Sequence, residues 1–183
     1  MSVLLRFDNV ALRRGGRLLF EDLGFQLVPG DALQVTGPNG SGKSSLIRLA
    51  AGLLRPERGS VERSPLALAD DHVALDRELP LKKALRLWAG DVDATMEALG
   101  LTGLAAVPVR LLSSGQLKRA TLARVAARGV ALWLLDEPFN GLDSDGAERL
   151  AHLIDRHRAA GGAVLAASHL PLAGEWCRLE LAQ

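Results

Sequence analysis

The sequence predicts an α/β fold in which most strands of the sheet run parallel. Two apolar runs, residues 130–135 and 163–167, have the length of buried strands. A third strand, residues 32–36, follows the turn signal Pro29-Gly30-Asp31. Stretches of helical character lie between these strands, and such alternation is typical of a parallel sheet covered by helices.

The N-terminal part of the chain departs from this alternation. Residues 4–10 and 18–27 have the composition of strands, and the pair Gly15-Gly16 between them is a turn signal. A turn this short joins strands that run in opposite directions. We therefore expect antiparallel N-terminal β-strands beside the parallel sheet.

The helices divide the chain further. A helix is expected at about residues 44–51, and apolar residues with helical spacing predict another around residues 147–154. Residues 72–128 are rich in Leu, Ala, Lys and Arg and predict a mostly helical segment. The length of 183 residues suits one domain. We expect a core from about 1–71 and 129–183, with a small inserted helical subdomain between them.

Composition limits the classes of partner. The 22 basic and 21 acidic residues leave a formal charge of +1, which predicts no nucleic-acid partner. Cys177 is the only cysteine, so neither an intrachain disulfide nor a thiolate zinc cluster can form. His72, His152 and His157 show no metal-ligand pattern, and His152 and His157 are expected on a solvated helix face. No apolar run reaches the roughly 18 residues of a membrane helix, and Asp8 interrupts any signal-peptide core. These features predict a cytosolic protein that meets a membrane through a partner.

A glycine-rich loop between the third strand and the first helix fits the pattern G-x-x-x-x-G-K followed by Ser or Thr. Its residues, together with the next one, are Gly37, Pro38, Asn39, Gly40, Ser41, Gly42, Lys43, Ser44 and Ser45. The glycines let backbone N–H groups approach phosphate oxygens, and the helix N-terminus adds partial positive charge. Lys43 is expected to reach the β- and γ-phosphates of a nucleotide, and the Ser44 hydroxyl to ligate Mg²⁺.

Two carboxylates follow an apolar strand. Asp136 and Glu137 end the run that begins at Ala131, and Pro138 follows them. A buried strand carries both to the carboxyl edge of the sheet, where α/β proteins bind ligands. Asp136 is expected to hold Mg²⁺, directly or through water, and Glu137 to polarise the attacking water as general base. The alternative is that the Asp-Glu-Pro sequence only marks a turn.

A short segment before the helical stretch 117–127 completes a recognisable order of motifs. The segment is Leu112, Ser113, Ser114, Gly115 and Gln116. With the phosphate loop and the acidic pair it resembles the ABC ATPase superfamily, whose signature reads L-S-G-G-Q, with Ser114 replacing the first glycine. The resemblance implies a P-loop NTPase core of the RecA-like type, in which Ser113, Ser114, Gly115 and Gln116 contact ATP bound by the opposite subunit. For the segment alone, a serine helix cap is the alternative.

Two further segments carry the resemblance. The run from Asn140 to Asp143 is similar to the family's D-loop, which implies that Asp143 lies at a dimer seam. Ser168-His169 follows the strand 163–167 and resembles the switch histidine. The resemblance implies that His169 contacts the γ-phosphate.

The chain also departs from the family pattern. It has no tyrosine, and no aromatic residue stands where the family's adenine-stacking residue precedes the phosphate loop. Arg13 or Arg14 is expected to cover the adenine instead, since a guanidinium plane can stack, while Phe20 is expected in the core. The glutamine of the Q-loop has no counterpart, and His72 lies nearest its place. That loop normally helps to bind Mg²⁺ and couples the nucleotide to the membrane subunit.

Within the superfamily the chain resembles the ATPase subunits of c-type cytochrome biogenesis, which are described as ATP-binding haem exporters. Residues 14–20, 132–143 and 168–172 carry this likeness. It implies a homodimer that binds two Mg-ATP molecules and an integral membrane transporter subunit. It also implies a peripheral location at the cytoplasmic face of the bacterial inner membrane.

Three alternatives remain open. One is the ATPase of another bacterial ABC transporter, which would differ in its membrane partner and not in its chemistry. A soluble ABC ATPase that acts on DNA or ribosomes would need a coiled coil, a second cassette or basic surfaces. A module that binds ATP without hydrolysing it is suggested by the missing glutamine, although Lys43, Asp136, Glu137 and His169 are all present.

Overall fold

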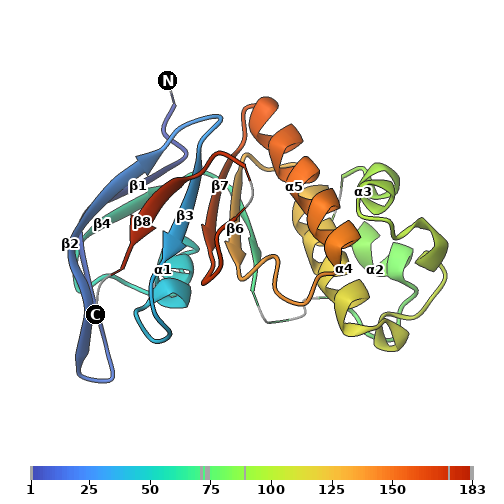
Figure 1. Cartoon of the computed structure of the whole chain (residues 1–183), viewed down its shortest axis with the longest axis horizontal. Helices are drawn as coiled ribbons and strands as arrows, with labels where there is room; N and C mark the ends of the chain where they lie inside the picture. The colour runs from blue at the N-terminus through green and yellow to red at the C-terminus, as the bar shows by residue number, and fades with distance from the viewer. Residues whose placement is uncertain (1, 71, 73–74, 89, 173, 182–183) are drawn as a thin grey trace.

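Two β-sheets and a set of helices make up the fold, seen in a computed structural model (Figure 1). The structure describes residues 2–70, 72, 75–88, 90–172 and 174–181. The strands are β1 Leu5–Arg14, β2 Arg17–Leu27, β3 Ala32–Thr36, β4 Arg58–Arg63, β5 Leu66–Ala69, β6 Leu132–Asp136, β7 Ala163–Ala167 and β8 Cys177–Glu180. The helices are α1 Lys43–Ala50, α2 Leu81–Arg86, α3 Val92–Ala98, α4 Ser114–Ala127 and α5 Ser144–Ala159, with 3-10 turns η1 Thr102–Leu104 and η2 Val109–Leu111.

The larger sheet contains five strands in the order β5-β6-β7-β3-β8, and every neighbouring pair is parallel. This arrangement confirms the predicted α/β fold with a mostly parallel sheet. The bounds of β3 and β7 coincide with the predicted ones. Because the strands are parallel, their carboxyl ends lie along one edge, where open α/β sheets bind ligands.

Hydrophobic cores lie on both faces of this sheet, because successive residues of a strand point to opposite faces. Leu132 and Leu134 of β6 pack into the core shared with α1 and the antiparallel strands. Trp133 and Leu135 pack into the core that contains α2 to α5. A strand buried on both faces reads as a continuous apolar run, which explains why β6 and β7 were predictable.

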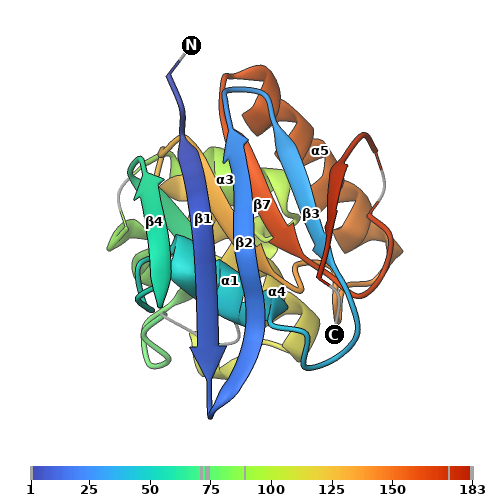
Figure 2. The same cartoon turned by 90° about the vertical axis from the view of Figure 1, so that its left-hand side faces the viewer.

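The smaller sheet has the order β2-β1-β4 and is antiparallel, as predicted for the N-terminal strands. Figure 2 shows it lying across α1 in front of the parallel sheet. Gly15 and Gly16 join β1 to β2 with φ values of 55° and 79°. Two positive φ angles in a two-residue hairpin turn are characteristic of type I′, which favours glycine at both positions.

The part of the chain between β5 and β6 contains α2, α3, η1, η2 and α4 in that order, and no strand among its described residues. These helices gather at the end of the molecule away from the antiparallel sheet (Figure 1). That grouping is consistent with the predicted helical subdomain, whose boundaries at about 72 and 128 stay a prediction. Among the described residues, no helix combines the length and the apolar character needed to cross a membrane.

One histidine differs from its prediction. His152 is exposed on α5, as expected, with 74% of its side chain accessible. His157, on the same helix, does not lie on a solvated face. Its ring stacks on Trp133, with centroids 3.8 Å apart and planes 10° from parallel, and its Nε2 lies 3.1 Å from the Ala131 carbonyl oxygen. Burial lowers the pKa of His157. Hydrogen bonds to the backbone at Ala131 and Ala163 act to raise this pKa, but the effect of burial is larger.

Candidate nucleotide site

The phosphate loop connects β3 to α1 at the carboxyl edge of the parallel sheet. Gly37, Gly40 and Gly42 have φ values of 141°, 83° and 106°, which are unfavourable for residues with a Cβ. At Gly37 a Cβ would also lie only 2.6 Å from the Leu181 carbonyl oxygen and 2.8 Å from the Ser41 hydroxyl. The loop therefore requires glycine for its conformation, and at Gly37 for its packing as well.

Positive charge gathers where this loop enters α1. Gly42 is the N-cap of α1, no side chain accepts a hydrogen bond there, and the first turn holds no acidic residue. Lys43 is buried, and its ammonium donates hydrogen bonds to the carbonyl oxygens of Gly37 (2.8 Å) and Pro38 (3.0 Å). A cation and a helix N-terminus at the same place form an anion site of the kind that binds phosphate.

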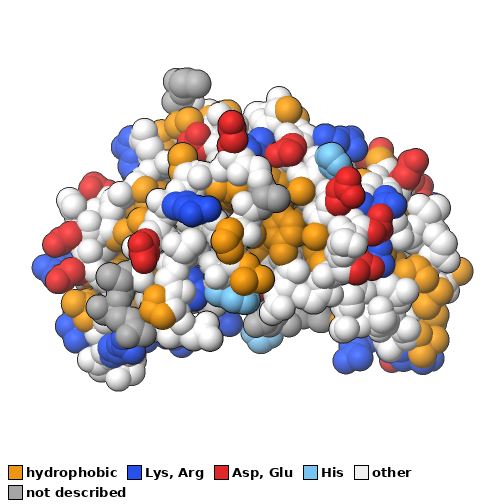
Figure 3. All heavy atoms as spheres, viewed as in Figure 1, with side chains coloured by type: hydrophobic (Ala, Val, Ile, Leu, Met, Phe, Trp, Pro, Cys, Tyr) orange, Lys and Arg blue, Asp and Glu red, His pale blue; other side chains and the backbone are white. Residues whose placement is uncertain are grey.

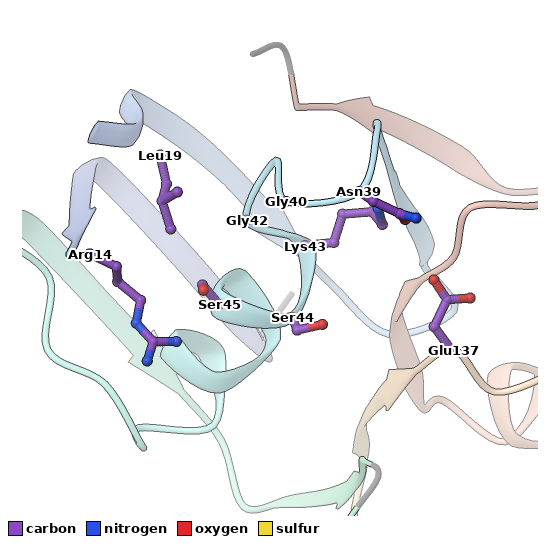
Figure 4. Close-up of a pocket in the computed structure, with 9 residues that line it drawn as sticks. All are labelled: Arg14, Leu19, Asn39, Gly40, Gly42, Lys43, Ser44, Ser45 and Glu137. Atoms are coloured by element: carbon purple, nitrogen blue, oxygen red, sulfur yellow. The ribbon is translucent and has the colours of Figure 1, made fainter. Parts of the chain in front are cut away.

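A pocket of about 490 Å³ lies in front of the loop (Figure 4). Its volume is within the range of sites that bind small molecules. The residues that line it are Arg14, Leu19, Asn39, Gly40, Gly42, Lys43, Ser44, Ser45 and Glu137. The pocket thus brings the phosphate loop together with Glu137, a residue almost a hundred positions later in the chain.

The acidic pair lies at the end of β6. Asp136 is the last residue of the strand and is 5% exposed. Glu137 has a φ of 46°, in the left-handed region, and its N–H donates to the Ala167 carbonyl oxygen at 2.9 Å. A non-glycine residue in this region costs about 1–2 kcal/mol, and such strain is concentrated at functional sites. The conformation leaves the Glu137 side chain against the pocket.

His169 lies beside Glu137. Its Nδ1 is 2.9 Å from Glu137 Oε2, although the two residues are 32 positions apart. The contact arises because β6 and β7 are neighbours in the sheet and each residue follows the end of its strand. The pair joins a carboxylate to an imidazole at the wall of the pocket.

A second cavity borders the same pair from the other side. Its volume is about 520 Å³, and it is lined by Glu137, His169, the turn after β7 and one face of α5. Figure 3 shows hydrophobic side chains gathered in the middle of this face of the molecule. Phe139, Ala151 and Leu172 belong to this lining.

The signature segment lies at the start of α4. Ser113 caps the helix: its hydroxyl accepts from Gln116 N–H at 3.3 Å, and its own N–H donates to Gln116 Oε1 at 2.9 Å. Ser114 is exposed, and a Cβ at Gly115 would lie 3.3 Å from the Gly141 carbonyl oxygen. None of these four signature residues is among the described residues that line the phosphate-loop pocket.

Asp143 lies at the start of α5, and His72 lies after the end of β5. Asp143 is exposed and caps α5, and its Oδ1 accepts from the Gly146 N–H at 2.8 Å. His72 is exposed after β5, the neighbour of β6, and its N–H donates to Asp70 Oδ1 at 3.1 Å. The residues that flank His72, at positions 71, 73 and 74, lie outside the described part of the chain.

Arg14 is the arginine that lines the phosphate-loop pocket. Arg13 pairs with Glu57 at 3.4 Å and donates to the Gly16 carbonyl oxygen at 3.1 Å, so its guanidinium is held elsewhere. Phe20 is in the core, as expected. Sequence reasoning missed Leu19, the other pocket residue from the hairpin. Strand alternation gives no signal for Leu19, because it packs against the same core as Phe20, and its Cβ lies 3.3 Å from where a Cβ on Gly42 would stand.

The oxygen donors at this edge of the sheet fit Mg²⁺. The described residues contain no group of three or more His, Cys, Asp or Glu side chains that would hold a metal by themselves. Magnesium bound with a nucleotide usually needs only one or two protein oxygens, because phosphate and water supply the others. The Ser44 hydroxyl is exposed at the pocket and the Asp136 carboxylate ends the adjacent strand β6, so both are oxygen donors at the expected edge.

Comparison with known proteins gives a consistent result. The ABC transporter family model matches residues 20–140. A protein of Sphingopyxis alaskensis described as cytochrome c biogenesis ATP-binding export protein CcmA is 55% identical, with 94% of this chain and 93% of that protein covered. The protein of the same description from Novosphingobium aromaticivorans is 53% identical, with 93% and 91% covered.

A solved structure supports the fold. The structure of an ATP-binding subunit of an ABC transporter superposes with a TM-score of 0.88 over 97% of this chain and 85% of that one, at 23% identity. Family model, relatives and fold therefore agree. The chain belongs to the ABC transporter family, in the group of cytochrome c biogenesis ATP-binding export proteins.

Proposed function

We propose that this protein binds Mg-ATP in the phosphate-loop pocket and hydrolyses it to ADP and phosphate. The observation that carries the proposal is the position of Glu137, which lines the same pocket as Lys43 and contacts His169 at 2.9 Å. A carboxylate at the wall of a phosphate site can orient and polarise the water that attacks the γ-phosphate.

Each residue has a separate part in this reaction. The Lys43 ammonium and the N–H groups at the start of α1 bind the β- and γ-phosphates. The Ser44 hydroxyl and the Asp136 carboxylate hold Mg²⁺, which neutralises charge on the phosphates when it is bound. Glu137 accepts a proton from the attacking water, and His169 contacts Glu137 and the γ-phosphate. Arg14 and Leu19 contact the nucleoside end of ATP.

The complete site requires two copies of the chain. In the proposed homodimer, Ser113, Ser114, Gly115 and Gln116 of one subunit close on ATP bound by the other, and Asp143 lies at the seam. The exposed positions of Ser113 and Ser114, outside the chain's own pocket, support this arrangement. ATP binding would close the dimer and hydrolysis would reopen it.

The cycle would drive an export complex that serves c-type cytochrome biogenesis, by exporting or releasing haem. Support comes from the relatives, which are described as cytochrome c biogenesis ATP-binding export proteins. In this proposal the dimer binds integral membrane subunits at the cytoplasmic face of the bacterial inner membrane. His72, after β5, lies nearest the place of the coupling glutamine.

Substitution of the general base tests the chemistry. Glu137→Gln is expected to lower the rate of phosphate release by about 100-fold or more, because it removes the proton acceptor. ATP binding should persist, so the variant should accumulate as an ATP-bound dimer in size-exclusion chromatography. Glu97→Gln, an exposed carboxylate on α3, is the matched control. Hydrolysis at the wild-type rate by Glu137→Gln would remove Glu137 from its proposed role.

Capture of partners tests the pathway. Tagged Glu137→Gln protein would be purified from membranes in detergent with Mg-ATP, and co-purifying proteins identified by mass. Recovery of a multi-spanning membrane protein together with cytochrome c maturation components would support the proposed pathway. Recovery of an unrelated permease or of ribosomes would leave the ATPase in place and overturn the pathway.

A further inference from the structure

Gln34 is a polar residue in the middle of an apolar strand. It lies on β3, between Leu33 and Val35, and it is 0% exposed. Burial of an amide costs free energy unless its polar atoms find hydrogen-bond partners. The presence of glutamine at this position therefore needs a specific contact to explain it.

That contact is with the turn that presents His169. Gln34 Nε2 donates a hydrogen bond of 2.7 Å to the carbonyl oxygen of Leu170, the residue after His169. One residue further along β3, the Val35 carbonyl oxygen accepts from the Ser168 N–H at 3.1 Å. β3 thus holds the turn of residues 168–170 at two points, one on each side of His169.

The turn is also closed on itself. The Ser168 hydroxyl accepts a hydrogen bond from the Leu170 N–H at 3.1 Å and donates one to the Leu170 carbonyl oxygen at 3.0 Å. The Leu170 carbonyl is therefore held by both the Ser168 hydroxyl and the Gln34 amide. His169 projects from this turn towards Glu137, at 2.9 Å.

We propose that Gln34 is a positioning residue for ATP hydrolysis, which holds the turn of residues 168–170 so that His169 keeps its contact with Glu137. The inference rests on the proposed ATPase function. It also gives a route between two parts of the site, because β3 continues directly into the phosphate loop at Gly37. The strand that carries the phosphate loop and the turn that carries the histidine are then joined by this side chain as well as by the backbone bond between Val35 and Ser168.

The hydrogen bonds of Gln34 allow a positioning role in catalysis to be distinguished from a contribution to the stability of the fold. The Gln34 Oε1 atom is buried and has no hydrogen-bond partner among the described residues, so only the N–H₂ end of the amide contributes a bond. Methionine has a similar length and no polar group, so Gln34→Met removes this unpaired acceptor as well as the donor. The Leu170 carbonyl oxygen keeps the hydrogen bond from the Ser168 hydroxyl, so Gln34→Met leaves no buried acceptor without a partner there, and the cost in stability is expected to be small. A change in catalysis without a change in stability is therefore the signature of a positioning role.

The first experiment compares Gln34→Met with the wild type. We expect kcat for ATP hydrolysis to fall about tenfold, since small misplacements of catalytic groups have effects of this size or more. KM for ATP and the urea midpoint of unfolding should stay close to the wild-type values. Thr95→Val is the matched control, because it removes a buried 2.7 Å bond from a side chain to the Asp91 carbonyl oxygen, far from the pocket. This control should leave kcat unchanged.

A double-mutant cycle with His169→Ala tests whether Gln34 acts through the histidine. In the His169→Ala background, Gln34→Met should cause little further loss of kcat, because the group that it positions is absent. An equal fold-loss in both backgrounds, or a wild-type kcat in Gln34→Met, would overturn the inference.

A spectroscopic measurement keeps the inference independent of turnover. The imidazole resonances of His169, assigned by comparison with His169→Ala, should shift in the NMR spectrum of Gln34→Met and stay in place in Thr95→Val. Unchanged His169 resonances in Gln34→Met would overturn the inference even if kcat fell. Absence of hydrolysis in the wild-type protein would instead contradict the proposed function, and the resonances would still decide the role of Gln34.

Discussion

At the scale of single residues, Glu137 combines backbone strain with the chemical role proposed for it. Its φ of 46° places it in a region that glycine occupies readily and glutamate does not. The Glu137 N–H donates to the Ala167 carbonyl oxygen, and the Glu137 carbonyl oxygen accepts from the Asn140 N–H. These two hydrogen bonds hold the conformation between β7 and the following turn. The fold thus offsets the strain, and the carboxylate is directed to the pocket and to His169.

His157 provides a prediction on pH. Burial holds its pKa below the ordinary histidine value of about 6.5, so below this pH the unfolded chain takes up a proton that the folded chain does not. The stabilising contribution of neutral His157 is complete above about pH 6.5 and is lost as pH falls towards its folded-state pKa. Urea unfolding between pH 7 and pH 5 should show this loss in the wild type. His157→Phe, which keeps a ring against Trp133, should show a smaller dependence.

The control for this prediction is the other histidine of α5. His152 is exposed, so His152→Gln should retain the pH dependence of the wild type. If His157→Phe and the wild type lost equal amounts of unfolding free energy between pH 7 and pH 5, the burial of His157 would not contribute to the pH dependence of stability.

Sequence reasoning could single out candidate site residues but could not predict their contacts. Lys43 and Glu137 were identifiable because glycine spacing and an apolar strand leave a local pattern. The contact between Glu137 and His169 depends on the pairing of β6 with β7, which no local pattern contains. The choice of Arg14 over Arg13 likewise depends on which side of the hairpin faces α1.

At the scale of elements, the same distinction explains which strands were found. β3 and β7 are short, apolar and buried, so their bounds were predictable. β4, Arg58–Arg63, is mostly exposed and rich in charge, and β8, Cys177–Glu180, is an exposed edge strand. β5 has only four residues. These strands exist because a neighbouring strand offers hydrogen bonds, and a sequence pattern does not record that neighbour.

The capping box of α4 gives a prediction that separates folding from function. Ser113→Ala should lower the free energy of unfolding by about 1 kcal/mol, because the hydroxyl that accepts from Gln116 N–H is lost. Ser113→Asp should retain the wild-type stability, since aspartate is an equally good cap. In the proposed dimer its carboxylate would face the γ-phosphate of the other subunit's ATP. ATP-dependent dimerisation, measured by size-exclusion chromatography in the Glu137→Gln background, should therefore be lost.

Ser114→Ala is the control for the capping effect, because Ser114 is exposed and does not cap the helix. It should leave the unfolding free energy within about 0.5 kcal/mol of the wild type. If Ser113→Asp formed the ATP-bound dimer as readily as its parent, the start of α4 would not face the partner's nucleotide.

At the scale of the whole molecule, the parallel sheet separates two cores with different tasks. One core joins the sheet to α1 and the antiparallel strands around the phosphate loop. The other joins it to α2 to α5 and supports the signature segment. The two halves of the proposed ATP site are thus built on different cores of one chain. A head-to-tail pair of chains would bring each phosphate loop to the signature of its partner.

This arrangement predicts complementation between two inactive variants. Lys43→Ala destroys the phosphate loop and leaves the signature intact, whereas Ser113→Asp does the reverse. In a mixed head-to-tail dimer, one site combines both defects and the other combines the intact phosphate loop with the intact signature. If subunits exchange freely and the sites work independently, half of the dimers are mixed and each has one working site. An equimolar mixture should then recover about a quarter of wild-type phosphate release, whereas each variant alone stays inactive. A mixture as inactive as its components would show that each chain completes its own site, and the proposed dimer would have to be abandoned.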